Sequence, residues 1–235
     1  MEKKKDIPFT SSMSRFERVA ALGYIPMHVY LLPLALFGFF DEGQISELGV
    51  NVVCYTIAFV FLLVCLWRFL RREFDALCDY GPGLLAEVAK SYGILLLCNV
   101  VIGLALLLIG QTENPNNAEV VSLAGEDPGM TTAVAVFLAP VVEEAMFRGG
   151  VFGLLRKYSR AAAYIGSVLF FALYHIWGYA LNDPTAWLYV LQYLPAGILL
   201  ARAYEKTNSL WTSIFLHMTV NGIAMMAISA LGDFL

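Results

Sequence analysis

The feature that most constrains this chain is a group of three ionisable residues inside an apolar segment long enough to cross a membrane. Glu143, Glu144 and Arg148 lie in the run of residues 131–155, which is otherwise apolar. A charged side chain near the centre of a bilayer costs at least ~2.5 kcal/mol on insertion scales. These residues therefore need partners, water or a chemical task, and we interpret the segment as a functional site.

The spacing of the three residues assigns them different roles. In a helix, Glu144 and Arg148 are four residues apart on one face, with the acid nearer the N-terminus, which favours an ion pair. Glu143 points about 100° away around the same helix and has no local base, so it is free for chemistry. The alternative is that both acids only join this helix to another through buried hydrogen bonds.

The composition indicates a membrane protein. Of the 235 residues, 59% are hydrophobic and 14% are charged, and the mean hydropathy is +0.69, more apolar than a water-soluble core requires. Segments of about 18 or more apolar residues can cross a bilayer as helices. We therefore predict an all-α, polytopic transmembrane helical bundle of about seven spans, at residues 19–40, 50–67, 91–110, 131–155, 161–179, 187–204 and 210–231.

The basic residues predict the orientation of these spans, because Lys and Arg are enriched in cytoplasmic connections. Connections 41–47, 111–129 and 182–184 contain no base. The connections that alternate with them carry Lys3, Lys4, Lys5, Arg15, Arg18, Arg68, Arg71, Arg72, Lys90, Arg156, Lys157, Arg160, Arg202 and Lys206. This alternation predicts a cytoplasmic N-terminus and an external C-terminus.

Two further features concern the shape of the helices. Residues 68–90 mix apolar and charged side chains around a Gly-Pro-Gly break at 81–83, which is typical of an amphipathic helix in the cytoplasmic interface. An ordinary solvated connection is the alternative. We also expect Pro26, Pro33 and Pro195 to kink their spans.

Two of the three histidines lie in predicted spans with a companion four residues away. Phe171 precedes His175, and His217 precedes Asn221, so each pair shares one helix face. At 1.5 Å per residue from the predicted interfaces, both histidines, Asn221 and Glu143 lie at similar depth near the midplane. Four polar groups at one level predict one shared cavity.

The remaining histidine and the four cysteines receive simpler interpretations. His28 has no polar companion three or four residues away, so a hydrogen bond between helices is its expected role. The cysteines show no metal-ligand spacing and are expected to pack as small apolar residues; they are Cys54, Cys65, Cys78 and Cys98.

These groups are the inventory for hydrolysis of a peptide bond. A carboxylate and an imidazole can deprotonate a water molecule. A second imidazole and an amide can donate hydrogen bonds to a developing oxyanion. Alternatively, Glu143, His175 and His217 could bind Zn²⁺ with an open position for water, although no His-Glu-x-x-His motif is present.

The three motifs resemble those of the CPBP or ABI family of intramembrane proteases, which includes the type II CAAX prenyl endopeptidases. Residues 143–148 match Glu-Glu-x-x-x-Arg, residues 171–175 match Phe-x-x-x-His, and residues 217–221 match His-x-x-x-Asn. The motifs occur in the family's order on successive predicted helices. The resemblance covers about residues 131–230.

The resemblance implies a role for each motif residue. Glu143 and His175 would activate the attacking water, and His217 and Asn221 would stabilise the oxyanion. Supporting residues that shape the site would be Glu144, Arg148 and Phe171. The resemblance is compatible with a metalloprotease and with a metal-free glutamate mechanism, and we favour the metal-free one.

We therefore predict an integral membrane endopeptidase with an N-terminal membrane region at 1–130, comprising three spans and an interfacial segment, and a four-span catalytic core at 131–235. The expected partners are membrane lipids and a prenylated or membrane-embedded peptide or protein substrate, and no nucleic acid. No cofactor is required, and zinc is the alternative. Two rival classes are a proton-coupled transporter, although we find no inverted repeat, and a non-catalytic scaffold or immunity factor.

Overall fold

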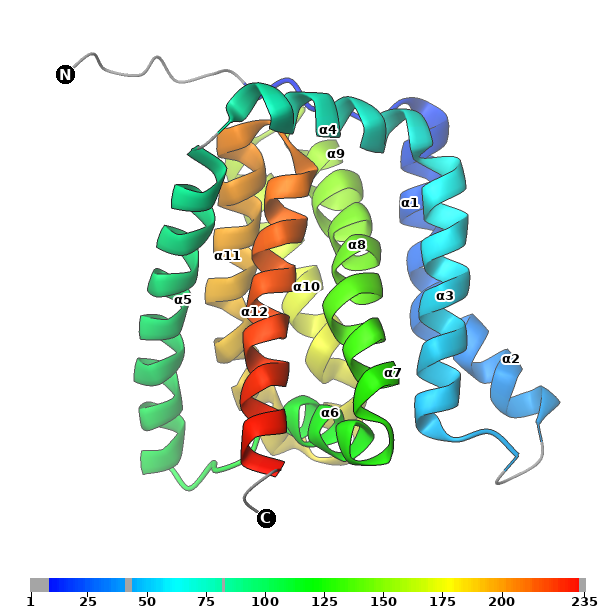
Figure 1. The fold of residues 1–235 in the computed structure, drawn as a ribbon, viewed down its shortest axis with the longest axis vertical. Helices are drawn as coiled ribbons and strands as arrows, with labels where there is room; N and C mark the ends of the chain where they lie inside the picture. The colour runs from blue at the N-terminus through cyan, green and yellow to red at the C-terminus, as the bar shows by residue number, and fades with distance from the viewer. Residues whose placement is uncertain (1–8, 41–43, 82, 233–235) are drawn as a thin grey trace.

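The computed structural model describes residues 9–40, 44–81 and 83–232, and these residues form helices and short connections without a strand. Seven of the described helical segments are long and apolar enough to cross a membrane, which confirms the predicted class (Figure 1). They are Arg15–Phe39, Glu47–Cys65, Gly83–Leu108, Pro128–Leu155, Arg160–Asn182, Pro184–Thr207 and Leu210–Ala230.

Several spans consist of more than one element. The first comprises α1 (Arg15–Pro26), the π-helical turn η1 (Met27–Leu31) and α2 (Leu32–Phe39). The fourth comprises α7 (Pro128–Thr132), η2 (Ala133–Leu138), α8 (Ala139–Glu144), η3 (Ala145–Phe152) and α9 (Gly153–Leu155), in which η2 and η3 are π-helical. The others are α3 (Glu47–Cys65), α5 (Gly83–Leu108), α10 (Arg160–Asn182), η4 (Pro184–Tyr189) with α11 (Val190–Thr207), and α12 (Leu210–Gly232).

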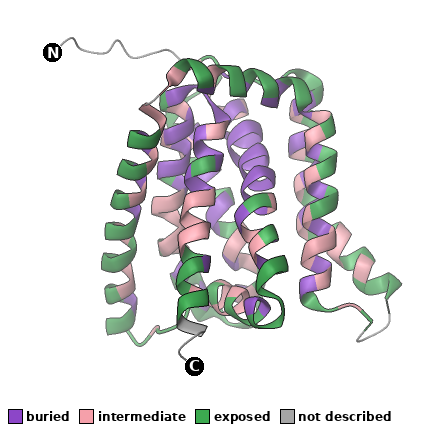
Figure 2. Cartoon of the chain, viewed as in Figure 1, coloured by how far each residue is buried: buried purple, intermediate pink, exposed green. Residues whose placement is uncertain are grey.

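The fourth span is the centre of the bundle. Of its most apolar 18-residue window, 67% is buried inside the protein, against 17% to 33% for the other six spans. Figure 2 shows the buried residues gathered around α8 and α9, whereas α5 is largely exposed. The charged residues of the sequence therefore lie on the helix that is most completely surrounded by protein, where other side chains can supply their partners.

Short helices lie across the two ends of the bundle (Figure 1). Of the segment 68–90, which we predicted to be an amphipathic helix, only the first part forms a separate helix, α4 (Trp67–Tyr80), whereas residues 83–90 are the start of α5. Helix α4 ends at Gly81, whose φ of 65° suits glycine. At the opposite end lies α6 (Pro115–Glu126), within the connection 111–129, for which we predicted no helix. Asn114 accepts a hydrogen bond from the N–H of Asn116, and Pro115 occupies the first helical turn, so this is a standard helix start.

The prolines of the first span accompany a local change of helix type. Pro26 ends α1 and is followed by η1, and Pro33 lies in the first turn of α2. Pro195 lies inside α11, which remains one helix. The sequence predictions for Lys3, Lys4, Lys5, Asp41 and Pro82 fall outside the described residues.

Glu73 anchors α4 to the N-terminal segment and to the start of α12. The Ser11 hydroxyl donates to Oε1 of Glu73 over 2.6 Å, and the backbone N–H of Leu210 donates to Oε2 over 2.9 Å. The second bond satisfies an N–H in the first turn of α12. Glu73 is 2% exposed, and burial raises its pKa to about 7.

This pKa predicts that the folded protein becomes less stable as the pH rises. Between pH 4.5 and 7 the folded state keeps a proton on Glu73 that the unfolded state has lost. The contribution of this group to the free energy of unfolding is therefore full below about pH 4.5 and is lost as the pH rises through about 7. The free energy of unfolding decreases by at most about 3 kcal/mol over this range. Melting in detergent should therefore occur at lower temperature at pH 8 than at pH 5.5, and Glu73→Gln should reduce that difference. An equal pH dependence in the variant would contradict the assignment.

Candidate active site

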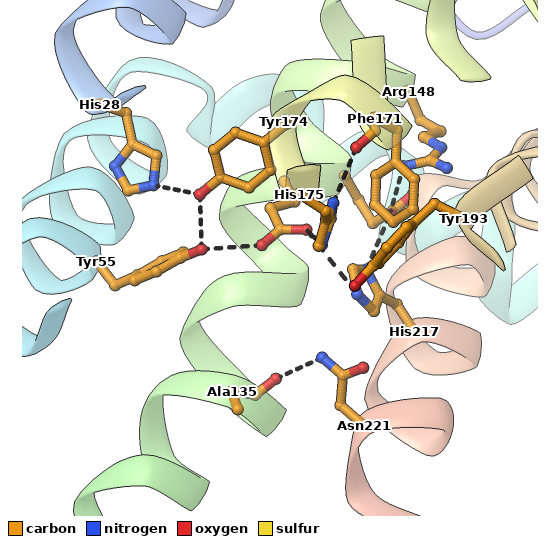
Figure 3. Close-up of polar contacts among 12 residues, drawn as sticks. His28, Tyr55, Ala135, Arg148, Phe171, Tyr174, His175, Tyr193, His217 and Asn221 are labelled. Carbon is orange, nitrogen blue, oxygen red and sulfur yellow. Dashed lines mark hydrogen bonds and ion pairs between the residues drawn. The ribbon is translucent and has the colours of Figure 1, made fainter. Parts of the chain in front are cut away.

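Three titratable side chains from three spans converge at the centre of the bundle (Figure 3). Glu143 lies on α8, His175 on α10 and His217 on α12. Nε2 of His175 is 3.6 Å from Oε2 of Glu143, and Nε2 of His217 is 4.0 Å from the same oxygen. The structure thus brings together three of the four residues predicted to share a cavity.

The two oxygens of Glu143 have different surroundings. Oε1 accepts a hydrogen bond from the Tyr55 hydroxyl over 3.0 Å. Oε2 is buried and accepts no hydrogen bond from the residues that the structure describes. It faces the two imidazoles, so Oε2 is the oxygen available to a reacting group.

Glu144 lies beside Glu143 in sequence but faces a different set of groups. It accepts hydrogen bonds from Arg148 Nη1 over 2.9 Å, from Ser213 Oγ over 2.5 Å and from His217 Nδ1 over 2.9 Å. The predicted ion pair with Arg148 is confirmed, and both side chains are fully buried. Glu144 therefore acts on the site through the orientation of His217.

Arg148 links the pair to two further helices. Its Nη2 donates to the carbonyl oxygen of Gly197 on α11 over 3.3 Å, and its guanidinium lies 4.3 Å from the centre of the Phe171 ring on α10. A Cβ atom at Gly197 would lie 3.3 Å from Cα of Val168, so glycine permits α11 to approach α10 closely. These contacts fix the guanidinium next to the site.

The hydrogen bonds of the imidazoles assign their protons. Nδ1 of His175 lies 2.8 Å from the carbonyl oxygen of Phe171, which can only accept, so this nitrogen carries a hydrogen. By the same argument Nδ1 of His217 donates to the carboxylate of Glu144. In the neutral rings, Nε2 is then the nitrogen with a lone pair, and both Nε2 atoms face Glu143. Tyr193 stacks on the His175 ring at 4.6 Å and helps to fix its orientation.

Asn221, the fourth residue predicted to share the cavity, forms a hydrogen bond to the backbone of the fourth span. Its Nδ2 donates to the carbonyl oxygen of Ala135 over 2.7 Å. Ala135 belongs to the π-helical turn η2, in which its carbonyl would pair with the N–H five residues later, but that residue is Pro140, which has no N–H. Asn221 thus satisfies a carbonyl that the proline leaves without a helical donor.

Several site residues have no motif that could have revealed them. His28, which has no polar companion in its own helix, forms the expected hydrogen bond between helices, with the Tyr174 hydroxyl. Tyr174 directly precedes His175 and could have been noticed for that reason. The residues that sequence reasoning missed are Tyr55, Tyr174, Tyr193 and Ser213, and three of them are recognised only by their contacts.

The candidate zinc ligands do not form a metal site in this arrangement. Among the described residues, no group of three or more His, Cys, Asp or Glu side chains is placed to hold a metal ion, so the metalloprotease prediction is unsupported. The four cysteines are all free. Glu143, His175 and His217 would be the ligands if zinc were bound.

The pairing of Asn221 with the carbonyl of Ala135 leads to a coupled prediction. Asn221→Ala should destabilise the protein by ~0.5–1.5 kcal/mol, because it removes the donor from a partly buried carbonyl. Pro140→Ala restores an N–H near that carbonyl, so the same Asn221 substitution should cost less in that background. Melting temperatures of the four proteins in detergent measure the coupling. Equal losses in both backgrounds would show that Asn221 does not compensate for the missing N–H of Pro140.

Comparison with known proteins agrees with the motifs. The family model described as type II CAAX prenyl endopeptidase Rce1-like matches residues 126–223, the region in which all three motifs lie. No curated protein and no solved structure matches the chain. The family is one of proteases, and the seven apolar spans identify an integral, multi-pass membrane protein. Residues 126–223 of this chain are therefore similar to the Rce1-like family of type II CAAX prenyl endopeptidases.

Proposed function

We propose that the protein is an intramembrane endopeptidase in which Glu143 and His175 activate a water molecule. The observation that carries the proposal is the convergence of Oε2 of Glu143 with two imidazole nitrogens at 3.6 and 4.0 Å, in a buried setting. A carboxylate and a neutral imidazole whose lone pairs face one point can each accept one hydrogen of a water molecule. The water oxygen then directs a lone pair away from them, toward a substrate carbonyl.

The reaction follows from this arrangement. As the water oxygen bonds to the carbonyl carbon, one water proton passes to Oε2 of Glu143 and the carbonyl electrons move to oxygen. When the carbon–nitrogen bond breaks, the leaving amine takes the proton back from Glu143. Atoms and charge balance without a Ser or Cys nucleophile, and one carboxylate serves as base and then as acid.

His217 is proposed as the donor to the oxyanion. For this role Nε2 must carry a hydrogen in addition to Nδ1, which makes the ring positively charged. Glu144 lies 2.9 Å from Nδ1, where its carboxylate can balance that charge. Asn221 was predicted to share this task, and in this geometry its amide donates to Ala135 instead. We therefore assign the oxyanion mainly to His217.

We propose a metal-free mechanism and a substrate of the CAAX type. The family description is that of prenyl endopeptidases, which suggests a peptide whose C-terminal region carries a lipid. An apolar chain would be soluble in the bilayer around this bundle, while the scissile bond enters among the polar groups. A membrane-embedded peptide without a prenyl group is the alternative substrate.

Glu143→Gln tests the proposal because it removes the base but retains the shape of the side chain. We expect kcat for a prenylated CAAX peptide to fall by about 10²-fold to 10⁴-fold, the usual contribution of a general base. His175→Ala should cause a similar loss. The matched control is Glu126→Gln, which changes an exposed acid on α6 and should leave cleavage unchanged. Full activity of Glu143→Gln would refute the mechanism.

The same preparations distinguish the metal-free from the zinc-dependent version. We expect substoichiometric zinc by mass spectrometry and unchanged cleavage after chelation. Stoichiometric zinc that is lost in Glu143→Gln would instead make Glu143, His175 and His217 a metal site. A wild-type protein that cleaves no peptide, prenylated or not, would favour the scaffold or transporter classes.

We also propose the orientation that the basic residues predict. Apart from the buried Arg148, the described bases, including those of α4, just after α9 and near the end of α11, lie toward the end of the bundle where α4 lies, and α6 lies at the other end (Figure 1). By the positive-inside rule, the α4 end is cytoplasmic. The C-terminal end of α12 is then external.

Cys78 provides a test of this orientation, because it is free, exposed and located on α4. In sealed right-side-out vesicles, a membrane-impermeant maleimide should label Cys78 only after permeabilisation. Glu126→Cys, at the end of α6, should be labelled without permeabilisation. The reverse labelling pattern would place the N-terminus outside.

A further inference from the structure

A series of hydrogen bonds leads from Glu143 into the N-terminal spans, outside the region matched by the family model. The Tyr55 hydroxyl on α3 donates to Oε1 of Glu143 over 3.0 Å and lies 2.7 Å from the hydroxyl of Tyr174 on α10. The Tyr174 hydroxyl lies 3.2 Å from Nε2 of His28 on η1 (Figure 3). We refer to His28, Tyr174 and Tyr55 as the donor chain.

The chemistry of the groups fixes the direction of every hydrogen in the donor chain. A phenol has one hydrogen, and Tyr55 gives its own to the carboxylate, which can only accept. Tyr55 must therefore accept from Tyr174. Tyr174 has then used its single hydrogen as well, so it accepts one from Nε2 of His28. All three hydrogens point toward Glu143.

The environment of His28 agrees with this direction. Its Nδ1 is buried and has no hydrogen-bond partner among the described residues, so it suits the unprotonated nitrogen of a neutral ring whose hydrogen is on Nε2. A second hydrogen on Nδ1 would leave a buried N–H unpaired. The ring is held between Tyr24, stacked at 6.0 Å, and Tyr55, edge-on at 4.7 Å.

The backbone at this point is also unusual. His28 is the second residue of the π-helical turn η1, directly after Pro26. Such turns occur frequently at functional sites because they re-aim one side chain within a helix. His28 is 4% exposed, although its span is among the least buried of the bundle. The first span thus directs one polar side chain inward, toward Tyr174.

We propose that Tyr55 is a positioning residue for Glu143, and that Tyr174 and His28 hold its hydroxyl in the donating direction. Because Oε1 is engaged by Tyr55, the proton of the attacking water passes to Oε2, the oxygen that faces His175 and His217. The N-terminal spans then complete an active site whose motifs all lie in residues 126–223. This inference rests on the proposed function of Glu143 as the base.

Tyr55→Phe tests the inference, since it removes the hydroxyl and keeps the ring. We expect kcat to fall by about 10-fold to 100-fold with little change in KM, the loss typical of one hydrogen bond to a charged group. The loss should fall on kcat while KM and the melting temperature stay near their wild-type values, because the ring and its packing are retained. A packing role would instead lower the melting temperature together with the activity.

Two further comparisons separate the donor chain from packing. Tyr24→Phe is the matched control: it removes a buried hydroxyl beside His28 that has no partner among the described residues, and it should leave the kinetics unchanged. His28→Gln retains an N–H donor in a similar place and should keep more activity than His28→Leu. The melting temperature of each variant is measured alongside its kinetics.

The outcomes distinguish this inference from the proposed function. If Glu143→Gln is inactive and Tyr55→Phe has wild-type kinetics, the donor chain is overturned and the proposed function stands. If Tyr55→Phe loses activity together with melting temperature and His28→Gln equals His28→Leu, the residues act by packing, which also overturns the inference. If the wild type cleaves no peptide, the proposed function fails and the inference with it.

Discussion

The buried ion pair between Glu144 and Arg148 is the interaction on which the centre of this bundle depends. Both side chains are fully buried, and two charges removed from water are stable only when their remaining hydrogen-bonding capacity is used. Glu144 uses it on Ser213 and His217 of α12. Arg148 uses part of it on Gly197 of α11 and lies over the ring on α10, while its buried Nε has no hydrogen-bond partner among the described residues. One pair therefore sets the relative positions of four spans, because each must supply its partner.

That pair also separates the roles of two adjacent carboxylates. Glu144 is saturated by a cation, a hydroxyl and an imidazole, and it is thereby committed to holding the site in place. Glu143, turned about 100° away, has one engaged oxygen and one that faces two imidazole nitrogens. A membrane interior favours this division, since an acid without fixed partners is costly there unless it takes part in chemistry.

The N-terminal spans pack against the region that carries the motifs and share one hydrophobic core with it. One hydrophobic cluster contains Ala21 and Leu62 together with Phe147 and Tyr204. Glu73 joins α4 to the start of α12, and Tyr55 reaches Glu143 from α3. The family model covers residues 126–223, but polar and apolar contacts connect that region to the rest of the described chain. The division at residue 130 thus remains a prediction based on motifs.

The sequence by itself determined the helical class, the seven spans and the pairing of Glu144 with Arg148, because apolar length and i, i+4 spacing are local properties of a helix. It also identified His175 and His217 as companions of Glu143. Only the tertiary structure decided that Asn221 donates to Ala135, that Glu144 orients His217, and that Tyr55 reaches Glu143. These contacts join residues 73 to 88 positions apart, and no local pattern encodes which faces of separate helices meet.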